Sequence, residues 1–391
     1  MKSLTSFLTR AVAVGMLTAF GCTAAHAQAT TSAASTQAAA SAAVHAQAAS
    51  SAAGPTQTVV VDGQTGEPVT FASVFNTATG HYLGITDGNG CLPQQARQVQ
   101  TVNVQHINYQ PVTVTLDTLA DGKMRLMPLV RTVKEVVVDR QQHDFVRLKV
   151  YVRHYVWMTD TLAKVTRGIC HLYLKPQKSS GKPKATWITA EALINRSILE
   201  GKRRPLVRGV LNLVPTDFIH IDGPRQLKQL PADSVARKVI SPRLGNWGLT
   251  YATFDWANKR CNLVKDSIFF DKPFTIPLTG YTMSNFFYTE SYDIRYGAPK
   301  FATLTNFIMG MKIAHKKSGA NINWYDEMYV LDADYASKAD YERELKNNND
   351  GNVGTLEEPE GLPAMNPNVV EAMKNMRELS LEERKELTER K

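Results

Sequence analysis

The chain has 391 residues, of which 43% are hydrophobic and 21% are charged, so it can bury more than one core and is not a wholly disordered protein. Its formal net charge is +9. Residues 340–391 carry thirteen acids and eight bases, so the basic excess lies in the rest of the chain, where it favours anionic partners.

Residues 1–27 predict a cleaved signal peptide. A basic start precedes a short apolar run from Ala11 to Phe20, and Ala25 and Ala27 form the small-x-small pattern of signal peptidase. The apolar run is too short to cross a bilayer, so no transmembrane span is expected after cleavage. We expect an exported protein, periplasmic or associated with the outer membrane, and this location argues against nucleic acid as a partner.

The cysteines leave two alternatives open. Cys22 follows a small residue, as a lipidated cysteine does, although Ala19 stands where Leu is usual; cleavage after Ala27 is the preferred interpretation. The mature chain keeps Cys91, Cys170 and Cys261. An odd number of cysteines without CxxC spacing allows at most one disulfide and predicts mainly buried or free thiols.

Two segments follow the signal peptide. Residues 28–54 are almost entirely Ala, Ser, Thr and Gln, which predicts a low-complexity linker without a core. Residues 55–139 hold short β-branched runs separated by turn signals, such as "QTGEP" (64–68) and Pro111. Phe71, Ser73 and Phe75 alternate with Ala72 and Val74. The spacing predicts a seven-stranded β-sandwich, whose last strand is expected at 133–139.

This segment resembles the carboxypeptidase regulatory-like domain, a transthyretin-like sandwich common in exported proteins of Bacteroidetes. The resemblance covers roughly residues 57–139, and Asn108 stands where the family usually has Gly before Tyr. It implies a structural or interaction module, because the peptidases that named the family carry catalysis in another domain. The matching pieces are "TGEPVTFASV" (65–74), "ITDGNG" (85–90), "HINYQPVTVTL" (106–116) and "VKEVVV" (133–138).

Residues 140–345 predict a larger, antiparallel β-rich domain of unknown function, so the fold class is mainly β. Stretches that alternate between turns lie at 168–176, 185–198, 208–223, 248–270 and 321–334, with a hairpin turn at 255–260. The stretch 145–158 fits a helix or a strand, and so does 305–317. The region weakly resembles the uncharacterised second region of exported proteins that share the front module.

Two surface features of this region have a functional and a structural interpretation. The basic stretches 175–184 and 199–209 are either faces for lipid or lipopolysaccharide or simply solvated loops. Aromatic side chains would either line a groove for an apolar ligand or form the core, which is the commoner role: Trp187, Trp247, Trp256, Phe286, Phe287 and Trp324.

No catalytic, cofactor-binding or metal-binding residue is predicted, and no cofactor is expected. HExxH, GxSxG, the P-loop and GxGxxG are absent, and no His is followed three positions on by Glu. The polar clusters "HID" (220–222) and "YDE" (325–327) are expected on the surface, with neighbours on opposite faces.

Residues 346–391 predict a linker and a charged helical tail. Asn366 before Pro367 is a helix start, and Ser380 with Glu383 resembles a capping box for a second helical stretch. An apolar stripe would either dock on the body or bind a partner, with a frayed solvated helix as the alternative: Val369, Val370, Met373, Met376 and Leu379.

Three functions remain open from the sequence. The leading hypothesis is an exported, non-catalytic interaction or scaffold protein of the cell envelope whose partners are proteins or envelope components. The second is a carrier of a hydrophobic ligand in the second domain. The third is an unrecognised hydrolase, which a cleft with converging His and acidic side chains would favour.

Overall fold

A computed structural model describes much of the chain from residue 57 to residue 380. The described ranges are 57–79, 82–106, 108–129, 143–159, 161–200, 216, 219–227, 237–239, 249–255, 259–266, 274–275, 281–295, 297–316, 319–349, 356–378 and 380. The signal peptide, the linker, the strand expected at 133–139, most of 199–209, Trp247, Trp256 and the second tail helix lie outside these ranges. The protein is mainly β, as the sequence predicts.

The first 130 residues contribute two small sheets. β1 (Val59–Asp62) pairs in parallel with β6 (Lys123–Leu126), and a four-stranded antiparallel sheet has the order β3-β2-β4-β5. Its strands are β2 (Ser73–Asn76), β3 (Tyr82–Ile85), β4 (Thr101–Gln105) and β5 (Val112–Thr115), with short 3-10 turns η1 (Gln94–Gln98) and η2 (Leu116–Thr118). Side chains between the two sheets form a core that includes Val60, Val74, Val104, Met124 and Leu126. We call residues 57–129 the sandwich.

An eleven-stranded sheet dominates the rest of the molecule. Its order is β10-β11-β12-β14-β15-β16-β7-β8-β9-β17, with β13 paired to β14, and every pairing is antiparallel. The strands are β7 (Phe145–Met158), β8 (Thr161–Leu174), β9 (Lys184–Asn195), β10 (Arg237–Val239), β11 (Leu249–Asp255), β12 (Arg260–Asp266), β13 (Phe274–Thr275), β14 (Tyr281–Asp293), β15 (Leu304–His315), β16 (Ala320–Ala336) and β17 (Met376–Glu378).

Strict alternation makes β7 a strand. Its even positions, such as Val150 and Val152, enter one core cluster, and its odd positions Tyr151, Tyr155 and Trp157 enter another. A helix would mix these two sets on one face, whereas a strand separates them with period two. The ambiguous stretch 305–317 is likewise mostly strand, and the hairpin expected at 255–260 joins β11 to β12. The strand β14 was not predicted.

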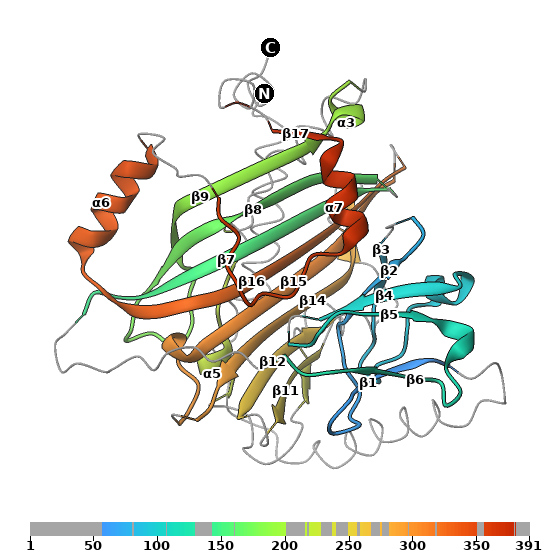
Figure 1. Ribbon diagram of the computed structural model, residues 1–391. Helices are drawn as coiled ribbons and strands as arrows, with labels where there is room; N and C mark the ends of the chain where they lie inside the picture. The colour runs from blue at the N-terminus through green and yellow to red at the C-terminus, as the bar shows by residue number, and fades with distance from the viewer. Residues whose placement is uncertain are drawn as a thin grey trace.

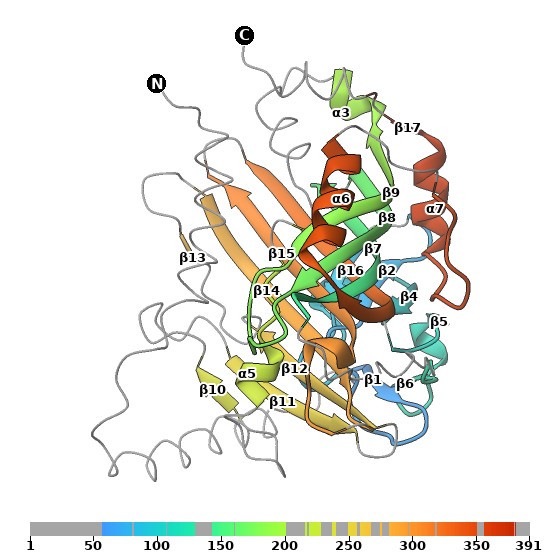
Figure 2. The ribbon, with the colours of Figure 1, turned by 90° about the vertical axis from the view of Figure 1, so that its left-hand side faces the viewer.

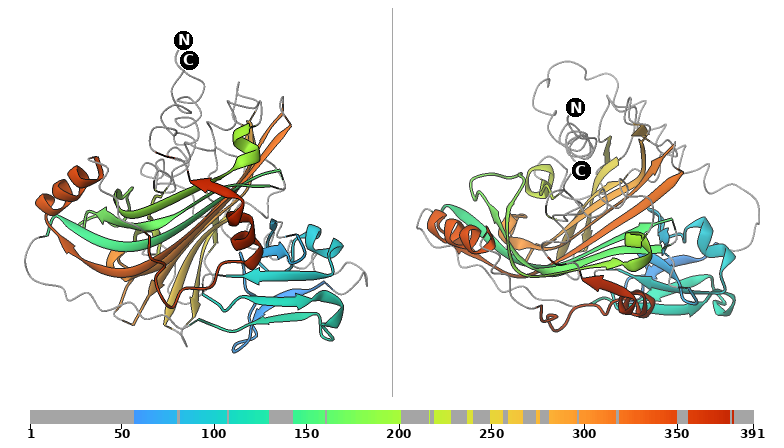
Figure 3. Two further views of the ribbon diagram at one scale, coloured as in Figure 1. Left: turned by 45° about the horizontal axis from the view of Figure 1, so that its top comes forward. Right: turned by 90° about the horizontal axis from the view of Figure 1, so that it is seen from above.

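The large sheet is strongly curved (Figure 1, Figure 3), and both of its faces are covered in part. The sandwich and the C-terminal segment lie on the convex side (Figure 3). The short helix α5 (Gly223–Leu227) lies on the concave side (Figure 2, Figure 3). Helix α3 (Arg196–Glu200) follows β9, the 3-10 turn η5 (Phe301–Thr303) precedes β15, and α6 (Lys338–Asn349) lies beside the end of β9.

The C-terminal segment docks on the body. Helix α7 (Pro367–Lys374) begins at Asn366, whose side chain accepts a hydrogen bond from the Asn368 amide at 2.8 Å, as the sequence predicts. Val369 is buried, and Met376 is buried in β17, which pairs with β9 and is the last strand on that side of the sheet. The frayed-helix alternative is therefore wrong for this part of the tail. The domain boundary expected at residue 345 lies inside α6.

Candidate functional site

An aromatic stack joins the sandwich to the convex face of the large sheet. Phe71 and Phe287 have ring centroids 5.8 Å apart and nearly parallel planes. Gly310 leaves room for the Phe287 ring, because a Cβ there would lie 2.3 Å from Phe287 Cε1. Beside this stack, Phe75 packs against Trp157. These contacts bury the outer face of residues 71–75, which run into β2, while Ala72 and Val74 on the other face enter the sandwich core.

Polar contacts cross the same interface. Asn306 donates to the side-chain oxygen of Asn108 at 2.6 Å, so Asn108 connects the sandwich to β15 of the large sheet. Arg260 donates to the carbonyl of Leu129 at 3.0 Å. Burial, with a smaller contribution from Arg260, lowers the pKa of His106 to about 3. The imidazole is therefore neutral at neutral pH.

A row of four charged residues crosses the convex face on adjacent strands. In register, Glu327 of β16 pairs with Arg153 of β7, Arg153 with Arg167 of β8, and Arg167 with Glu191 of β9. We call these four residues the arginine row. Arg167 contacts Glu191 at 2.5 Å, and Arg153 contacts Glu327 at 3.7 Å. Two arginines thus stand directly opposite each other, an arrangement that destabilises a sheet unless an anion compensates it.

The anion comes from an irregular segment far along the chain, residues 356–366, which we call the strap. Glu358 contacts Arg153 at 2.7 Å and Arg167 at 3.4 Å, and it accepts a hydrogen bond from Tyr151 at 3.2 Å. Arg153 also donates to the carbonyl of Pro363 at 2.7 Å. Its guanidinium lies 5.4 Å and 5.5 Å from the ring centroids of Tyr151 and Tyr329. Arg153 is therefore an anchor for the strap.

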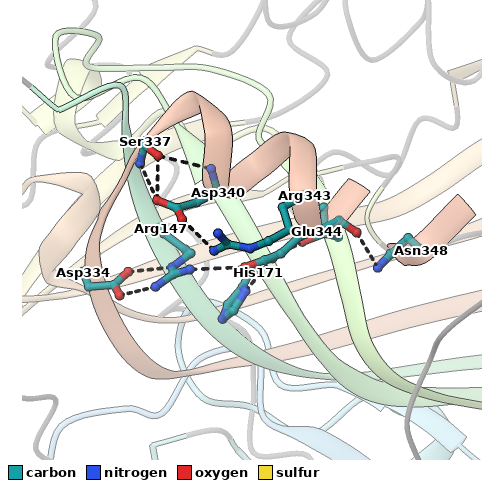
Figure 4. Close-up of polar contacts among 9 residues, drawn as sticks. Arg147, His171, Asp334, Ser337, Asp340, Arg343, Glu344 and Asn348 are labelled. Carbon is teal, nitrogen blue, oxygen red and sulfur yellow. Dashed lines mark hydrogen bonds and ion pairs between the residues drawn. The ribbon is translucent and has the colours of Figure 1, made fainter. Parts of the chain in front are cut away.

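Helix α6 is held at the end of the sheet by a second polar network (Figure 4). Arg147 of β7 forms a bidentate pair with Asp334, at 2.9 Å and 2.6 Å, and reaches Glu344 at 3.2 Å. Glu344 also accepts from His171 at 2.8 Å. Burial alone would raise the pKa of Glu344, but hydrogen bonds from His171, Tyr173 and Thr186 outweigh it and lower that pKa. Asn348 pairs with the backbone of Trp187 in β9. Trp187 lies in the part of β9 that β17 does not pair with, so this contact protects an open edge.

The concave face carries a row of polar residues among apolar ones. In register, Asp326 pairs with His154, and His154 pairs with Thr166. Asp326 Oδ1 lies 2.5 Å from His154 Nδ1, and Trp324 Nε1 donates to Asp326 Oδ2. His154 Nε2 and Thr166 Oγ1 have no partner among the described residues. A histidine beside a carboxylate can relay protons. His154 and Asp326 are both 0% exposed, however, so solvent does not reach either side chain.

A buried carboxylate on the same face holds the segment around α5. Glu290 accepts hydrogen bonds from the amides of Asp222 and Gly223 at 2.8 Å and 2.6 Å, and from the hydroxyls of Tyr288 and Tyr292. Burial, followed by the charge of Glu290, raises the pKa of both tyrosines well above its ordinary value. Both phenols therefore remain donors, and Glu290 is an anchor with its hydrogen-bonding capacity filled.

The two polar clusters that the sequence placed on the surface lie inside the protein. Asp222, Asp326 and Glu327 are buried, so the surface prediction was wrong. Opposite faces were predicted correctly for "YDE", because Asp326 faces His154 and Glu327 faces Arg153. Burial raises the pKa of Glu327, and Arg153 offsets this only in part. Partners on a neighbouring strand, His154 and Arg153, explain the buried charges of Asp326 and Glu327, and local sequence does not reveal such partners. Asp222 pairs with the nearby Arg225.

The predicted aromatics and lysines have mainly structural contacts. Phe286, Phe287 and Trp324 are buried, which confirms the core interpretation, and Trp187 is partly buried against the concave cluster. In the basic loop after β8, Lys175 lies 4.3 Å from the Phe145 ring centroid, and Lys184 lies 4.6 Å from that of Tyr341. These contacts tether both ends of the loop.

The thiols of the described chain are unpaired and poorly reactive. Cys91 is partly buried, and Cys170 and Cys261 are buried. Burial, with Asp87 adding to it, raises the pKa of Cys91 to about 11, and burial raises that of Cys261 to about 12. A thiolate nucleophile is therefore disfavoured at neutral pH. The described residues contain no group of three His, Cys, Asp or Glu side chains placed to hold a metal ion.

Comparison with known proteins leaves the chain without a family assignment. No protein-family model matches it, and no curated protein matches it either. Within the described ranges, no helix is both long enough and apolar enough to span a membrane. The interpretation of function therefore depends on the geometry of the arginine row, the strap, the sandwich contact and the concave polar row.

The sequence predicted no site residues, and the groups that stand out structurally were all missed. One signal was present in the stretch 145–158: His154 is the one polar residue of the even-numbered set, and Arg153 lies between Tyr151 and Tyr155 in the odd-numbered set. A charged residue on a buried strand face needs a partner. The sequence could thus have predicted that Arg153 is paired, but not with which residue.

Proposed function

We propose that this protein is an exported, non-catalytic interaction protein of the bacterial cell envelope. One observation carries the proposal: the arginine row, in which Arg153 and Glu327 are buried, holds the strap on the sheet, next to the docked sandwich. Arg153 and Arg167 are thereby engaged with Glu327, Glu191 and Glu358. Such a composite surface suits a protein that presents a fixed shape to partners.

The signal-peptide pattern and the family resemblance support the location. A start at Gln28 in the exported protein, found by N-terminal sequencing, is the expected result. A start at a lipidated Cys22 would instead mean that the protein is anchored to a membrane by its lipid. The carboxypeptidase regulatory-like resemblance supports an interaction role for the sandwich, since that module is non-catalytic where it accompanies a peptidase.

Site-specific photocrosslinking in cells tests the interaction role. Met127 on the sandwich is 51% exposed, so a photoreactive residue there should form discrete crosslinks to an envelope component. The matched control places the same residue at Lys178, in the loop after β8. No discrete crosslink from Met127, or the same products from Met127 and Lys178, in a protein shown to be exported, would contradict the proposal. Stoichiometric zinc together with chelator-sensitive release of C-terminal residues from peptides would contradict the non-catalytic assignment.

A carrier function is the second candidate, and one observation favours it. The concave face is lined by apolar side chains such as Val152 and Met328, and two buried atoms on it, His154 Nε2 and Thr166 Oγ1, have no partner among the described residues. A ligand with an apolar body and one polar group would satisfy both. Solvent extraction of the protein purified from its host, followed by mass spectrometry, should then release one compound that the His154→Leu variant lacks.

A further inference from the structure

The starting point is the like-charged pair at the centre of the convex face. Arg153 and Arg167 are register partners on β7 and β8. The outer acids of the row, Glu327 and Glu191, each lie beside one arginine only. Among the acidic residues that the structure describes, only Glu358 of the strap contacts both guanidinium groups. The two arginines and the hydroxyl of Tyr151 thus form a binding site for a carboxylate, which Glu358 occupies.

The strap is held by side chains rather than by backbone pairing. Among the described residues, no backbone–backbone hydrogen bond involves residues 356–365. The contacts that hold it include those of Glu358, the Arg153–Pro363 hydrogen bond, and the packing of Leu356, Leu362 and Met365 against the convex cluster. At its end, the side chain of Asn366 donates to Asn103 of the sandwich at 3.1 Å. Segments with few backbone hydrogen bonds open at low free-energy cost. The side chain of Glu358 is also 39% exposed, so solvent or a competitor reaches it.

We propose that the convex arginine pair is a recognition site for an acidic, extended segment of a partner protein, and that the strap is its internal competitor. This proposal rests on the proposed interaction function. The chemistry of the partner follows from what the strap presents: a carboxylate for the two guanidinium groups, an apolar residue four positions later, and a backbone carbonyl for Arg153. In the strap these are Glu358, Leu362 and Pro363. Charge complementarity selects an anionic segment.

Tethering explains why the site is closed in the isolated chain. A segment attached to the same chain is present at a high effective concentration, of the order of millimolar for short linkers. An external segment of equal affinity therefore competes poorly until the strap is weakened. Loss of one charge-assisted hydrogen bond changes an affinity by about tenfold or more. Weakening Glu358 alone should therefore open the site without removing the strap.

The test uses the full chain and a fluorescent peptide with the sequence of residues 356–366, blocked at both ends. In anisotropy titrations the peptide should bind the Glu358→Gln chain at least tenfold more tightly than the wild-type chain. Glu357→Gln is the matched control, because Glu357 is the exposed neighbouring carboxylate, and this variant should behave as wild type. A peptide with Gln in place of Glu358 should lose the preference, and so should the double variant Glu358→Gln, Arg167→Gln.

Three results would overturn the proposal. The first is equal or absent binding to the wild-type and Glu358→Gln chains when both give the same thermal unfolding transition. The second is tight binding of the Gln peptide. The third is a concentration-dependent dimer of the wild-type chain that the free peptide dissociates, which would make a second copy of this chain the occupant. The crosslinking experiment on Met127 does not use this site, so either test can fail without the other.

Discussion

Phe71 of the sandwich and Phe287 of β14 lie face to face across the junction of the two β modules, with ring centroids 5.8 Å apart and planes inclined by 5°. Two local features make this contact possible. Phe71 has a backbone φ of 59°, in the left-handed region that bulky residues avoid. Gly310 lies under the Phe287 ring. The junction thus combines a strained residue with a glycine that gives it room.

Replacing Gly310 with Ala should destabilise the protein by about 1–3 kcal/mol, because the new methyl group would overpack the junction. The added Cβ would lie 2.3 Å and 2.4 Å from two Phe287 ring atoms. The control is Gly181→Ala, where a Cβ would meet nothing within 4 Å and the change should be close to zero. Urea unfolding measures both. Equal losses of stability in the two variants would contradict the close packing of Gly310 against the Phe287 ring.

The left-handed backbone of Phe71 predicts an inverted order of substitutions. Phe71→Gly should be at least as stable as Phe71→Ala, because a left-handed conformation costs Ala about 1–2 kcal/mol that Gly does not incur. Phe75 lies on the same outer face with ordinary backbone geometry. There Phe75→Ala should be more stable than Phe75→Gly by about 0.5–1 kcal/mol. Thermal unfolding of the four variants gives their order of stability. If Ala is more stable than Gly at both positions, the backbone of Phe71 is not strained.

Arg153→Gln should cost about 3–5 kcal/mol, because it leaves Glu327 buried without its cation. The side chains of Arg153 and Glu327 are 3% and 7% exposed. Adding Glu327→Gln should recover part of that loss. The exposed pair Arg125–Asp121, with side chains 55% and 48% exposed, is the comparison, and Arg125→Gln should change stability by less than about 1 kcal/mol. Denaturant unfolding that shows similar losses for both arginines would exclude an anchoring role for Arg153.

Acid should destabilise the junction through His106. Its pKa is lowered to about 3 in the folded protein and is about 6.5 in an unfolded chain, so the unfolded state binds the proton more tightly. Above pH 6.5 the imidazole is neutral in both states, so His106 does not destabilise the protein. As the pH drops from 6.5 toward 3, the free energy of unfolding falls by at most about 1.4 kcal/mol per pH unit. Unfolding between pH 6.5 and 5 should show a shallower pH dependence in His106→Gln than in wild type. Identical slopes would rule out this titration.

The isolated fragment 55–139 should fold with a cooperative transition and β-type circular dichroism. Without the large sheet it exposes Phe71, Phe75 and Ile85, which are buried together in the full chain. We therefore expect it to self-associate, as exposed apolar patches do. Changing Phe71 and Phe75 to Ser should restore a monomer in analytical ultracentrifugation. A disordered fragment would show that the sandwich needs the sheet.

The sequence by itself determined the local features of this protein. Turn residues and period-two alternation depend on neighbours only, so they predicted the strands of the sandwich, the hairpin of β11 and β12, and the start of α7 at Asn366. Alternation also separated Phe71 and Phe75 from Ala72 and Val74. It could not show that both faces of β2 are buried, because the second face is covered by a sheet more than seventy residues away.

The tertiary structure decided everything that depends on distant pairing. Arg153 and Glu358 are 205 residues apart in sequence, and His154 and Asp326 are 172 apart. Asp326 was expected on the surface because burial of a charge is tolerated only when a partner is present, and its partner His154 comes from another strand. Strand order and register determine which residue becomes that partner. The antiparallel sheet places Arg153 opposite Arg167, and this juxtaposition gives the strap its site.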